Sequence, residues 1–174
     1  MLLGVGVGWL KEEFDAIGAD FETRGRRMDE YIAAMRELWS AEEPTFDGEF
    51  IRFKGAYCRP QPLNKRVPVI IGGDSKIAAR RAGRIGDGYF PARGAPEELF
   101  ALARETAMAH GRDPAELEFT ASLPNDLQML PRLAKLGISR VTVPVSGLVG
   151  AGLAIDGPED ALKWRDIIER YAGL

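Results

Sequence analysis

The sequence predicts an α/β protein in which parallel strands alternate with helices. Short segments rich in apolar and β-favouring residues occur at residues 2–7, 67–71, 88–91, 117–122 and 139–145. Such segments are typical of strands that are buried in a parallel sheet. Between them lie longer segments whose apolar residues recur at helical spacing, and glycine or proline marks most of the junctions.

The first half of the chain combines one long helix with a hairpin. Residues 24–40 carry apolar residues at helical spacing, which predicts an amphipathic helix. Its apolar face contains Met28, Tyr31, Ile32, Met35, Leu38 and Trp39. Residues 11–22 are polar with interspersed aromatic residues, and we expect a loop there. Within residues 43–53, the turn at Asp47 and Gly48 lies between β-favouring arms and predicts a small hairpin.

The second half repeats the alternation of strand and helix. Helices are expected at residues 75–85, 96–110 and 125–136, and from Gly157 onward. Pro96 stands at a favoured first position of a helix, whereas Gly111 and Gly137 are expected to end two of them. Either Asn125 or Asp126 is suited to cap the third helix. The apolar face of the final helix contains Ala161, Trp164, Ile168 and Tyr171.

The alternation of five strands with five helices restricts the architecture. Short connections of this kind require right-handed crossovers and a parallel sheet. Two architectures satisfy the pattern, namely an open doubly wound sheet and a part of a (β/α)₈ barrel. A complete barrel typically has about 250 residues, so 174 residues supply about five of its eight units. The length fits a single domain over residues 1–174.

Composition excludes several classes of function. The formal net charge is −3 and no basic cluster is present, which argues against nucleic acid or an anionic membrane as the main partner. One cysteine, Cys58, permits no intrachain disulfide and fits a reducing compartment. No apolar run approaches the roughly 20 residues that span a bilayer, and the N-terminus lacks the features of a signal peptide. We therefore expect a cytoplasmic protein.

Common catalytic motifs are absent from the sequence. There is no metal-ligand spacing of His, Cys and carboxylates, no Walker-type phosphate loop and no nucleophile elbow. His110 is the single histidine. Because it precedes Gly111 at an expected helix end, we interpret it as a surface or capping residue.

Two pairs of segments resemble the luciferase-like monooxygenase family. The first pair is the glycine-rich start, residues 3–9 (LGVGVGW) followed by EEFDAIG, with residues 21–30 (FETRGRRMDE). The second pair is residues 68–73 (PVIIGG) with residues 78–89 (AARRAGRIGDGY). With the hairpin between them and the closing helix, the likeness covers nearly the whole chain. The deazaflavin (coenzyme F420)-dependent oxidoreductase branch is the most similar part of the family.

The resemblance implies a TIM barrel with an insertion that binds F420 or FMN at the C-terminal ends of its strands. In that frame the chain is a partial barrel that corresponds to the fourth to eighth β/α units, with the first three absent. The family places its principal catalytic side chains largely in those absent units. No catalytic residue is therefore assigned in this chain.

Residues at the end of the first strand are candidates for holding the coenzyme ring. Without a Cβ, Gly6 and Gly8 allow a flat ring to lie against the main chain, although a tight turn with positive φ explains these glycines equally well. The resemblance places Trp9 where some deazaflavin-dependent relatives carry a glutamate acid. In this chain that acid is replaced by an indole that forms an apolar wall or belongs to the core.

A second group of candidates lies at the start of the helix over residues 75–85. Gly72, Gly73, Asp74 and Ser75 precede main-chain N–H groups that have no partner within the helix and that favour an anion such as a coenzyme phosphate. The alternative makes Asp74 or Ser75 an ordinary helix cap, and the negative charge of Asp74 counts against a phosphate.

Several arginines are candidate anion ligands. Arg24 resembles an arginine near the flavin phosphate of FMN-binding relatives, and Arg26 and Arg27 are neighbours able to replace it. The alternative is a solvated basic turn in which these arginines pair with nearby acidic residues, namely Glu22, Asp29 or Glu30. Arg93 and Ser146 follow strands and are further possible anion contacts.

Two functions follow as expectations. The first is a flavin- or deazaflavin-dependent oxidoreductase or monooxygenase that acts on a small-molecule substrate. The second is a non-catalytic truncated barrel that binds a cofactor or serves in assembly, since a fold alone does not fix a function. Open edges of an incomplete sheet invite pairing with another chain, so we expect a homo-oligomer or a complementary barrel fragment.

Overall fold

The structure is a computed structural model that describes residues 1–143, 155 and 157–173. It divides into two compact units, an N-terminal unit of residues 1–70 and a C-terminal unit of residues 71–174. A five-stranded sheet has the order β1-β4-β5-β6-β7, so strands that follow one another in the main alternation are neighbours. The predicted α/β class with parallel strands is confirmed, and β1 and β7 are the two ends of the strand order.

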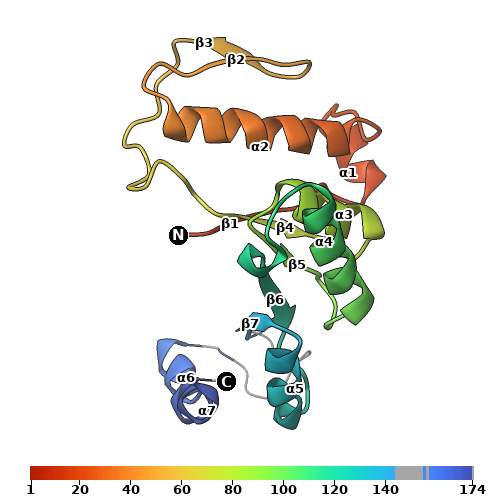
Figure 1. The fold of residues 1–174 in the computed structure, drawn as a ribbon, viewed down its shortest axis with the longest axis vertical. Helices are drawn as coiled ribbons and strands as arrows, with labels where there is room; N and C mark the ends of the chain where they lie inside the picture. Colours follow the sequence, from red (N-terminus) through yellow and green to blue (C-terminus); the bar gives the residue numbers. More distant parts are fainter. Residues whose placement is uncertain (144–154, 156, 174) are drawn as a thin grey trace. The chain divides into compact units, whose positions relative to one another are not determined.

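Seven strands and seven α-helices occur in the described part of the chain (Figure 1). The strands are β1 (Leu3–Val5), β2 (Thr45–Asp47), β3 (Arg52–Lys54), β4 (Val69–Gly72), β5 (Gly88–Phe90), β6 (Glu118–Ser122) and β7 (Ile138–Thr142). The helices are α1 (Lys11–Ala16), α2 (Arg24–Ser40), α3 (Lys76–Ile85), α4 (Glu97–Ala109), α5 (Leu130–Lys135), α6 (Pro158–Leu162) and α7 (Arg165–Tyr171). Two short 3₁₀ helices are η1 (Pro114–Glu116) and η2 (Leu127–Met129).

The N-terminal unit is built on α2, whose bounds match the predicted helix. The predicted hairpin is also confirmed, because β2 and β3 pair antiparallel and the rings of Phe46 and Phe53 stack across them at 5.9 Å. One prediction for this unit was wrong, since the expected loop over residues 11–22 contains α1. That helix has no buried residue, but Lys11 and Asp15, one turn apart, form an ion pair of 2.7 Å, and the Phe14 ring meets the Phe21 ring edge to face at 5.2 Å.

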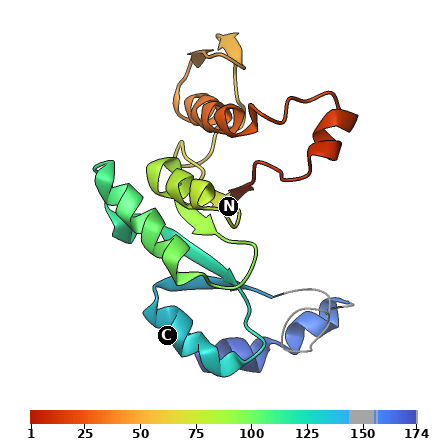
Figure 2. The same cartoon turned by 90° about the vertical axis from the view of Figure 1, so that its right-hand side faces the viewer.

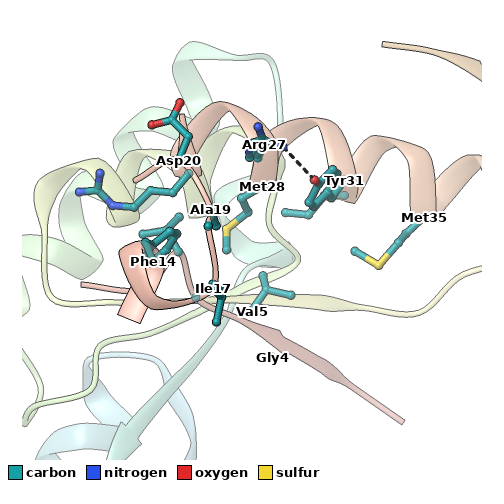
Figure 3. Close-up of a pocket in the computed structure, with 15 residues that line it drawn as sticks. Gly4, Val5, Phe14, Ile17, Ala19, Asp20, Arg27, Met28, Tyr31 and Met35 are labelled. Carbon is teal, nitrogen blue, oxygen red and sulfur yellow. Dashed lines mark hydrogen bonds between the residues drawn. The ribbon is translucent and has the colours of Figure 1, made fainter. Parts of the chain in front are cut away.

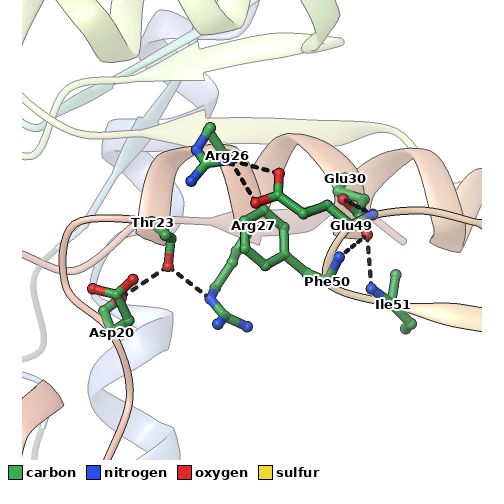
Figure 4. A network of polar contacts seen from close by, with 8 residues as sticks. All are labelled: Asp20, Thr23, Arg26, Arg27, Glu30, Glu49, Phe50 and Ile51. Carbon is green, nitrogen blue, oxygen red and sulfur yellow. Dashed lines mark hydrogen bonds and ion pairs between the residues drawn. The ribbon is translucent and has the colours of Figure 1, made fainter.

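Glu30 joins α2 to the hairpin. Its carboxylate accepts the main-chain N–H groups of Glu49, Phe50 and Ile51 at 3.0, 2.7 and 2.7 Å (Figure 4). A Cβ on Gly48 would collide with this carboxylate, so a larger residue there would displace Glu30 from these bonds. Burial by itself raises the pKa of Glu30, but the three N–H donors together lower the pKa below its ordinary value.

The core of the C-terminal unit contains a row of aromatic rings. Tyr89 on β5, Phe100 on α4 and Phe119 on β6 are buried, and successive rings meet edge to face at 5.8 and 5.0 Å. The parallel register places Tyr89 opposite Phe119 on the neighbouring strand. The guanidinium of Arg104 covers the Phe119 ring at 4.4 Å and donates to the carbonyl of Leu136 at 2.6 Å.

Helices α3 and α4 lie side by side (Figures 1 and 2). Gly83 permits this close approach, because a Cβ there would meet the Ala103 carbonyl oxygen, the Thr106 Cβ at 2.8 Å and the Ala107 nitrogen at 2.9 Å. Arg112 satisfies carbonyl groups at the end of α3, donating to Gly83 and Gly86 at 2.6 Å each. The small size of Gly83 thus allows the two helices to approach, and the hydrogen bonds from Arg112 hold the end of α3.

The C-terminal predictions need two corrections. The helix expected over residues 125–136 is divided into η2, which Asp126 caps, and α5, because Pro131 has no N–H to continue the hydrogen-bond ladder. The expected final helix is likewise divided into α6 and α7. The N–H groups of Lys163 and Trp164 bond carbonyls three residues back instead of four, at 3.1 and 3.3 Å, which interrupts the α-helix.

The last predicted strand is confirmed only in part, because β7 ends at Thr142 and residues 144–145 lie outside the described residues. Pro96 occupies the N-cap position of α4, one residue before the first helical residue Glu97, so the expected first helical position was wrong by one residue. No helix in the described residues has the length and apolar character needed to cross a membrane.

Replacing Glu30 by Gln is expected to destabilise the protein at neutral pH and to change its response to acid. A carboxylate with a lowered pKa contributes stability above its unfolded pKa and loses that contribution as the pH falls through the folded value. The difference in melting temperature between the wild type and Glu30→Gln should therefore shrink from pH 7 to pH 3. Glu22→Gln, at an exposed position, is the matched control. A difference that grows on acidification would contradict this account.

Replacing Gly83 by Val is expected to lower the free energy of unfolding by about 3 kcal/mol, because overpacking forces α3 away from α4. The exposed Arg80 lies one turn earlier on the same helix, and Arg80→Val should cost only about 0.5 kcal/mol through helix propensity. Urea unfolding followed by circular dichroism measures both values. Equal costs for the two variants would show that the close approach is unimportant.

Candidate functional site

A pocket of about 790 Å³ lies in the N-terminal unit between β1, the segment after it and α2 (Figure 3). Most of its lining is apolar, and Asp20, Arg24 and Arg27 supply charge. Its apolar lining includes Val5, Val7, Phe14, Ile17, Met28, Ile32 and Met35. The volume lies within the range typical of small-molecule sites.

The two candidate glycines of the first strand have different roles. Gly6 lines the pocket, and a Cβ built on it would meet no atom within 4 Å, so the main chain there borders open space. Gly8 has a φ of +79°, and its Cβ would lie 2.7 Å from the Phe14 ring. The turn explanation therefore accounts for Gly8, whereas nothing in the local conformation requires a glycine at residue 6.

Trp9 does not belong to the core. It is 83% exposed and does not line the pocket, so the expectation of a core role was wrong. The other expectation, that the Trp9 indole forms an apolar wall for a ligand, stays a prediction.

Arg24 begins α2 and lines the pocket. Its guanidinium lies 3.5 Å from the centre of the Phe21 ring, and one terminal nitrogen donates to the Phe21 carbonyl at 2.6 Å. Its Nε is buried and has no hydrogen-bond partner among the described residues. A buried donor without an acceptor is costly, so this atom is suited to an acceptor brought by a ligand.

The neighbouring arginines already have partners (Figure 4). Nη1 of Arg26 donates to both carboxylate oxygens of Glu49, at 2.7 and 2.5 Å, a partner that the sequence did not indicate. Arg27 donates from Nε to the Thr23 hydroxyl at 2.9 Å. Hydrogen bonding by Thr23, and then by the N–H of Glu22, lowers the pKa of Asp20, which keeps a negative charge at the pocket.

In the C-terminal unit, the four remaining candidates form one turn between β4 and α3. Gly72 is the last residue of β4. Gly73 has a φ of +129°, and a Cβ on it would lie 3.2 Å from the Ala78 Cβ, so this position requires glycine. Its N–H donates to the carbonyl of Phe90 at 3.2 Å.

Asp74 and Ser75 both have structural partners. The Ser75 hydroxyl caps α3 by accepting the N–H of Ala78 at 3.1 Å, which confirms the ordinary helix-cap explanation for this residue. Asp74 accepts the main-chain N–H of Arg93 at 3.1 Å and does not cap the helix. Among the described residues, no partner is present for the N–H groups of residues 74–77.

Tyr89 is a residue that the sequence did not indicate. Its hydroxyl donates to the Gly73 carbonyl at 2.7 Å, although its ring is fully buried in the core. A contact between residues 16 positions apart leaves no periodic pattern, so no local signal identifies it. Burial, followed by the charges of Asp74 and Glu98, raises the pKa of Tyr89, and its hydroxyl therefore remains a donor.

The structure thus places the candidates in two separate groups. Gly6 and Arg24 line the pocket of the N-terminal unit, whereas Gly8 and Trp9 do not. The turn of the C-terminal unit holds Gly72, Gly73, Asp74 and Ser75, with Arg93 bound to Asp74. His110 is exposed and contacts the Thr106 carbonyl at 2.9 Å, which confirms the surface or capping role.

Ser146 lies outside the described residues. Within the residues that the structure describes, no group of three or more His, Cys, Asp or Glu side chains is arranged to hold a metal ion.

Curated relatives match almost the whole chain. F420-dependent glucose-6-phosphate dehydrogenase of Mycolicibacterium smegmatis is 32% identical over 177 residues, which cover 97% of this chain and 52% of that protein. The enzyme of the same name from Mycobacterium tuberculosis is 31% identical over 186 residues, which cover 98% and 55%. The chain therefore spans about half the length of these relatives.

Solved structures support the fold. An F420-dependent secondary alcohol dehydrogenase superposes with a TM-score of 0.60 at 23% identity, over 76% of this chain and 43% of that one. The monooxygenase RslO1 from Streptomyces bottropensis gives a TM-score of 0.59 at 24% identity, over 78% and 44%.

The family model for luciferase-like monooxygenases matches residues 1–125, which include β1, the α2–hairpin segment and the β4–α3 turn. The match covers more than half of the chain and both groups of candidate residues. On this match, the chain belongs to the luciferase-like monooxygenase family.

Proposed function

We propose that this chain functions in an F420-dependent oxidoreductase of the luciferase-like type. The observation that carries the proposal is the likeness to F420-dependent glucose-6-phosphate dehydrogenases over 97–98% of the chain. That likeness includes both the Gly6 segment and the turn at Gly72 and Gly73. A fold match alone would not indicate a coenzyme.

The pocket of the N-terminal unit has features that suit the coenzyme. Gly6 gives a flat ring access to the main chain, since a Cβ there would have no neighbour within 4 Å. The apolar lining suits an aromatic ring system. The buried Nε of Arg24 provides a donor that needs an acceptor, such as an oxygen of the coenzyme.

The turn of the C-terminal unit has features that suit a phosphate. The N–H groups of residues 74–77 are free of partners in the described structure, and the dipole of α3 adds positive potential at this end. Asp74 adds an unfavourable charge, and its carboxylate is partly occupied by the N–H of Arg93. In this proposal Gly73 and Ser75 shape the turn, while the main chain supplies the donors.

F420 when bound supplies hydride-transfer chemistry, and the protein contributes binding, orientation and exclusion of water. Gly6 and Arg24 would hold the coenzyme in the pocket, and Trp9 would provide an apolar cover for it. Trp9 also favours the second candidate function, because it stands where the resemblance implies a glutamate acid. On that observation, the alternative is a chain that binds coenzyme without catalysis.

Fluorescence titration of the purified chain with F420, and separately with FMN, tests the proposal. We expect saturable binding of F420 and at least tenfold weaker binding of FMN. Reduction of the bound F420 by a donor, beginning with the glucose 6-phosphate named for the relatives, separates the enzyme from the non-catalytic module. Binding of FMN alone would reassign the coenzyme, and binding of neither would contradict the proposal.

Removing the charge of Asp74 is expected to strengthen F420 binding. Asn at this position keeps an oxygen that accepts the N–H of Arg93, but it no longer repels a phosphate. The interaction of one charge with a helix terminus is worth about 0.3–1 kcal/mol, so Asp74→Asn should lower the dissociation constant about two- to fivefold. Asp113→Asn is the matched control, because Asp113 caps η1 through the N–H of Ala115 at 2.9 Å. Weaker binding by Asp74→Asn than by the control variant would place the phosphate elsewhere.

A further inference from the structure

The hydroxyl of Tyr89, the only polar group of its side chain, donates to the turn between β4 and α3. The residue has no exposed surface, yet its hydroxyl reaches the Gly73 carbonyl at 2.7 Å. Its ring is fixed in the core by Phe100, at 5.8 Å between ring centres. The bond therefore runs from a rigid support to a residue in the candidate phosphate turn.

Two residues of β5 form hydrogen bonds with the main chain of Gly73. Its N–H donates to the carbonyl of Phe90, and its carbonyl accepts the hydroxyl of Tyr89. Its φ of +129° is a conformation that residues with a Cβ rarely adopt. Two hydrogen bonds thus maintain an unusual main-chain conformation just before residues 74–77.

This conformation determines where the next amides point. A rotation at Gly73 would turn the peptide that follows, whose N–H belongs to Asp74, the first of the amides without a partner in the described structure. A preorganised set of donors binds an anion more tightly than one that must first be ordered. The bond from Tyr89 is therefore placed to affect phosphate affinity without touching the phosphate.

We propose that Tyr89 is a positioning residue, which holds Gly73 so that the amides at the start of α3 are aligned for the coenzyme phosphate. This inference rests on the proposed function and assigns a role to a residue outside the coenzyme contacts. Tyrosine is suited to the role because its ring packs in the core while its hydroxyl donates to the turn.

Tyr89→Phe removes the hydroxyl and keeps the ring that packs against Phe100. Two probes are titrated into the wild type and the variant, namely F420 and the deazaflavin nucleoside that lacks the phosphate. We expect Tyr89→Phe to weaken F420 binding about tenfold, the effect of losing about 1.4 kcal/mol, and to leave nucleoside binding unchanged. Tyr57→Phe is the control, since Tyr57 is 64% exposed and should alter neither affinity.

The pair of probes separates positioning from a merely structural role. General loosening of the fold would weaken both probes equally, and that result would overturn the inference, as would unchanged F420 affinity. Gly73→Ala disturbs the same turn independently and should reproduce the selective loss if Tyr89→Phe folds poorly, as judged by circular dichroism. If the wild type binds neither probe, the proposed function itself fails, and the inference fails with it.

Discussion

The turns of this protein depend on side chains that satisfy main-chain groups left open by helices and strands. Unpaired main-chain groups are costly wherever water is excluded. Glu30 accepts hydrogen bonds from three consecutive N–H groups at the hairpin. Arg112 donates to carbonyls at the end of α3, and Tyr89 donates to the carbonyl of Gly73. Each contact joins an irregular segment to a regular element. Of these contacts, the one made by Tyr89 lies at a candidate region, the turn between β4 and α3.

The same constraint separates glycines with different roles. A Cβ on Gly83 would collide with the backbone of α4 and one on Gly48 with the Glu30 side chain, whereas Gly8 and Gly73 also have positive φ. Gly6 has neither restriction, and it borders the pocket. A glycine without a structural requirement is the kind of position where close approach by a ligand is a sufficient reason for its presence.

Local pattern predicted the regular elements well. The bounds of α2 follow from its apolar face, and the cap of α3 follows from Ser75, because both signals lie within a few residues. The expected loop over residues 11–22 was wrong, because α1 forms there, and the expected single final helix was wrong, because a shift to three-residue hydrogen bonds interrupts it. The Tyr89–Gly73 bond and the pairing of Arg26 with Glu49 join distant residues, so no spacing rule indicates them. Similarly, the sequence indicated Gly6 but not the pocket that Gly6 lines.

In the proposed function, the amides at the start of α3 receive the phosphate of F420. Hydrogen–deuterium exchange of the full chain, with and without F420, reports on this binding mode at the amides themselves, because the amides of residues 74–77 have no partner within the described structure. We expect F420 to slow exchange at these amides and the nucleoside without the phosphate to leave it unchanged. Saturating F420 that leaves their exchange unchanged would contradict this binding mode.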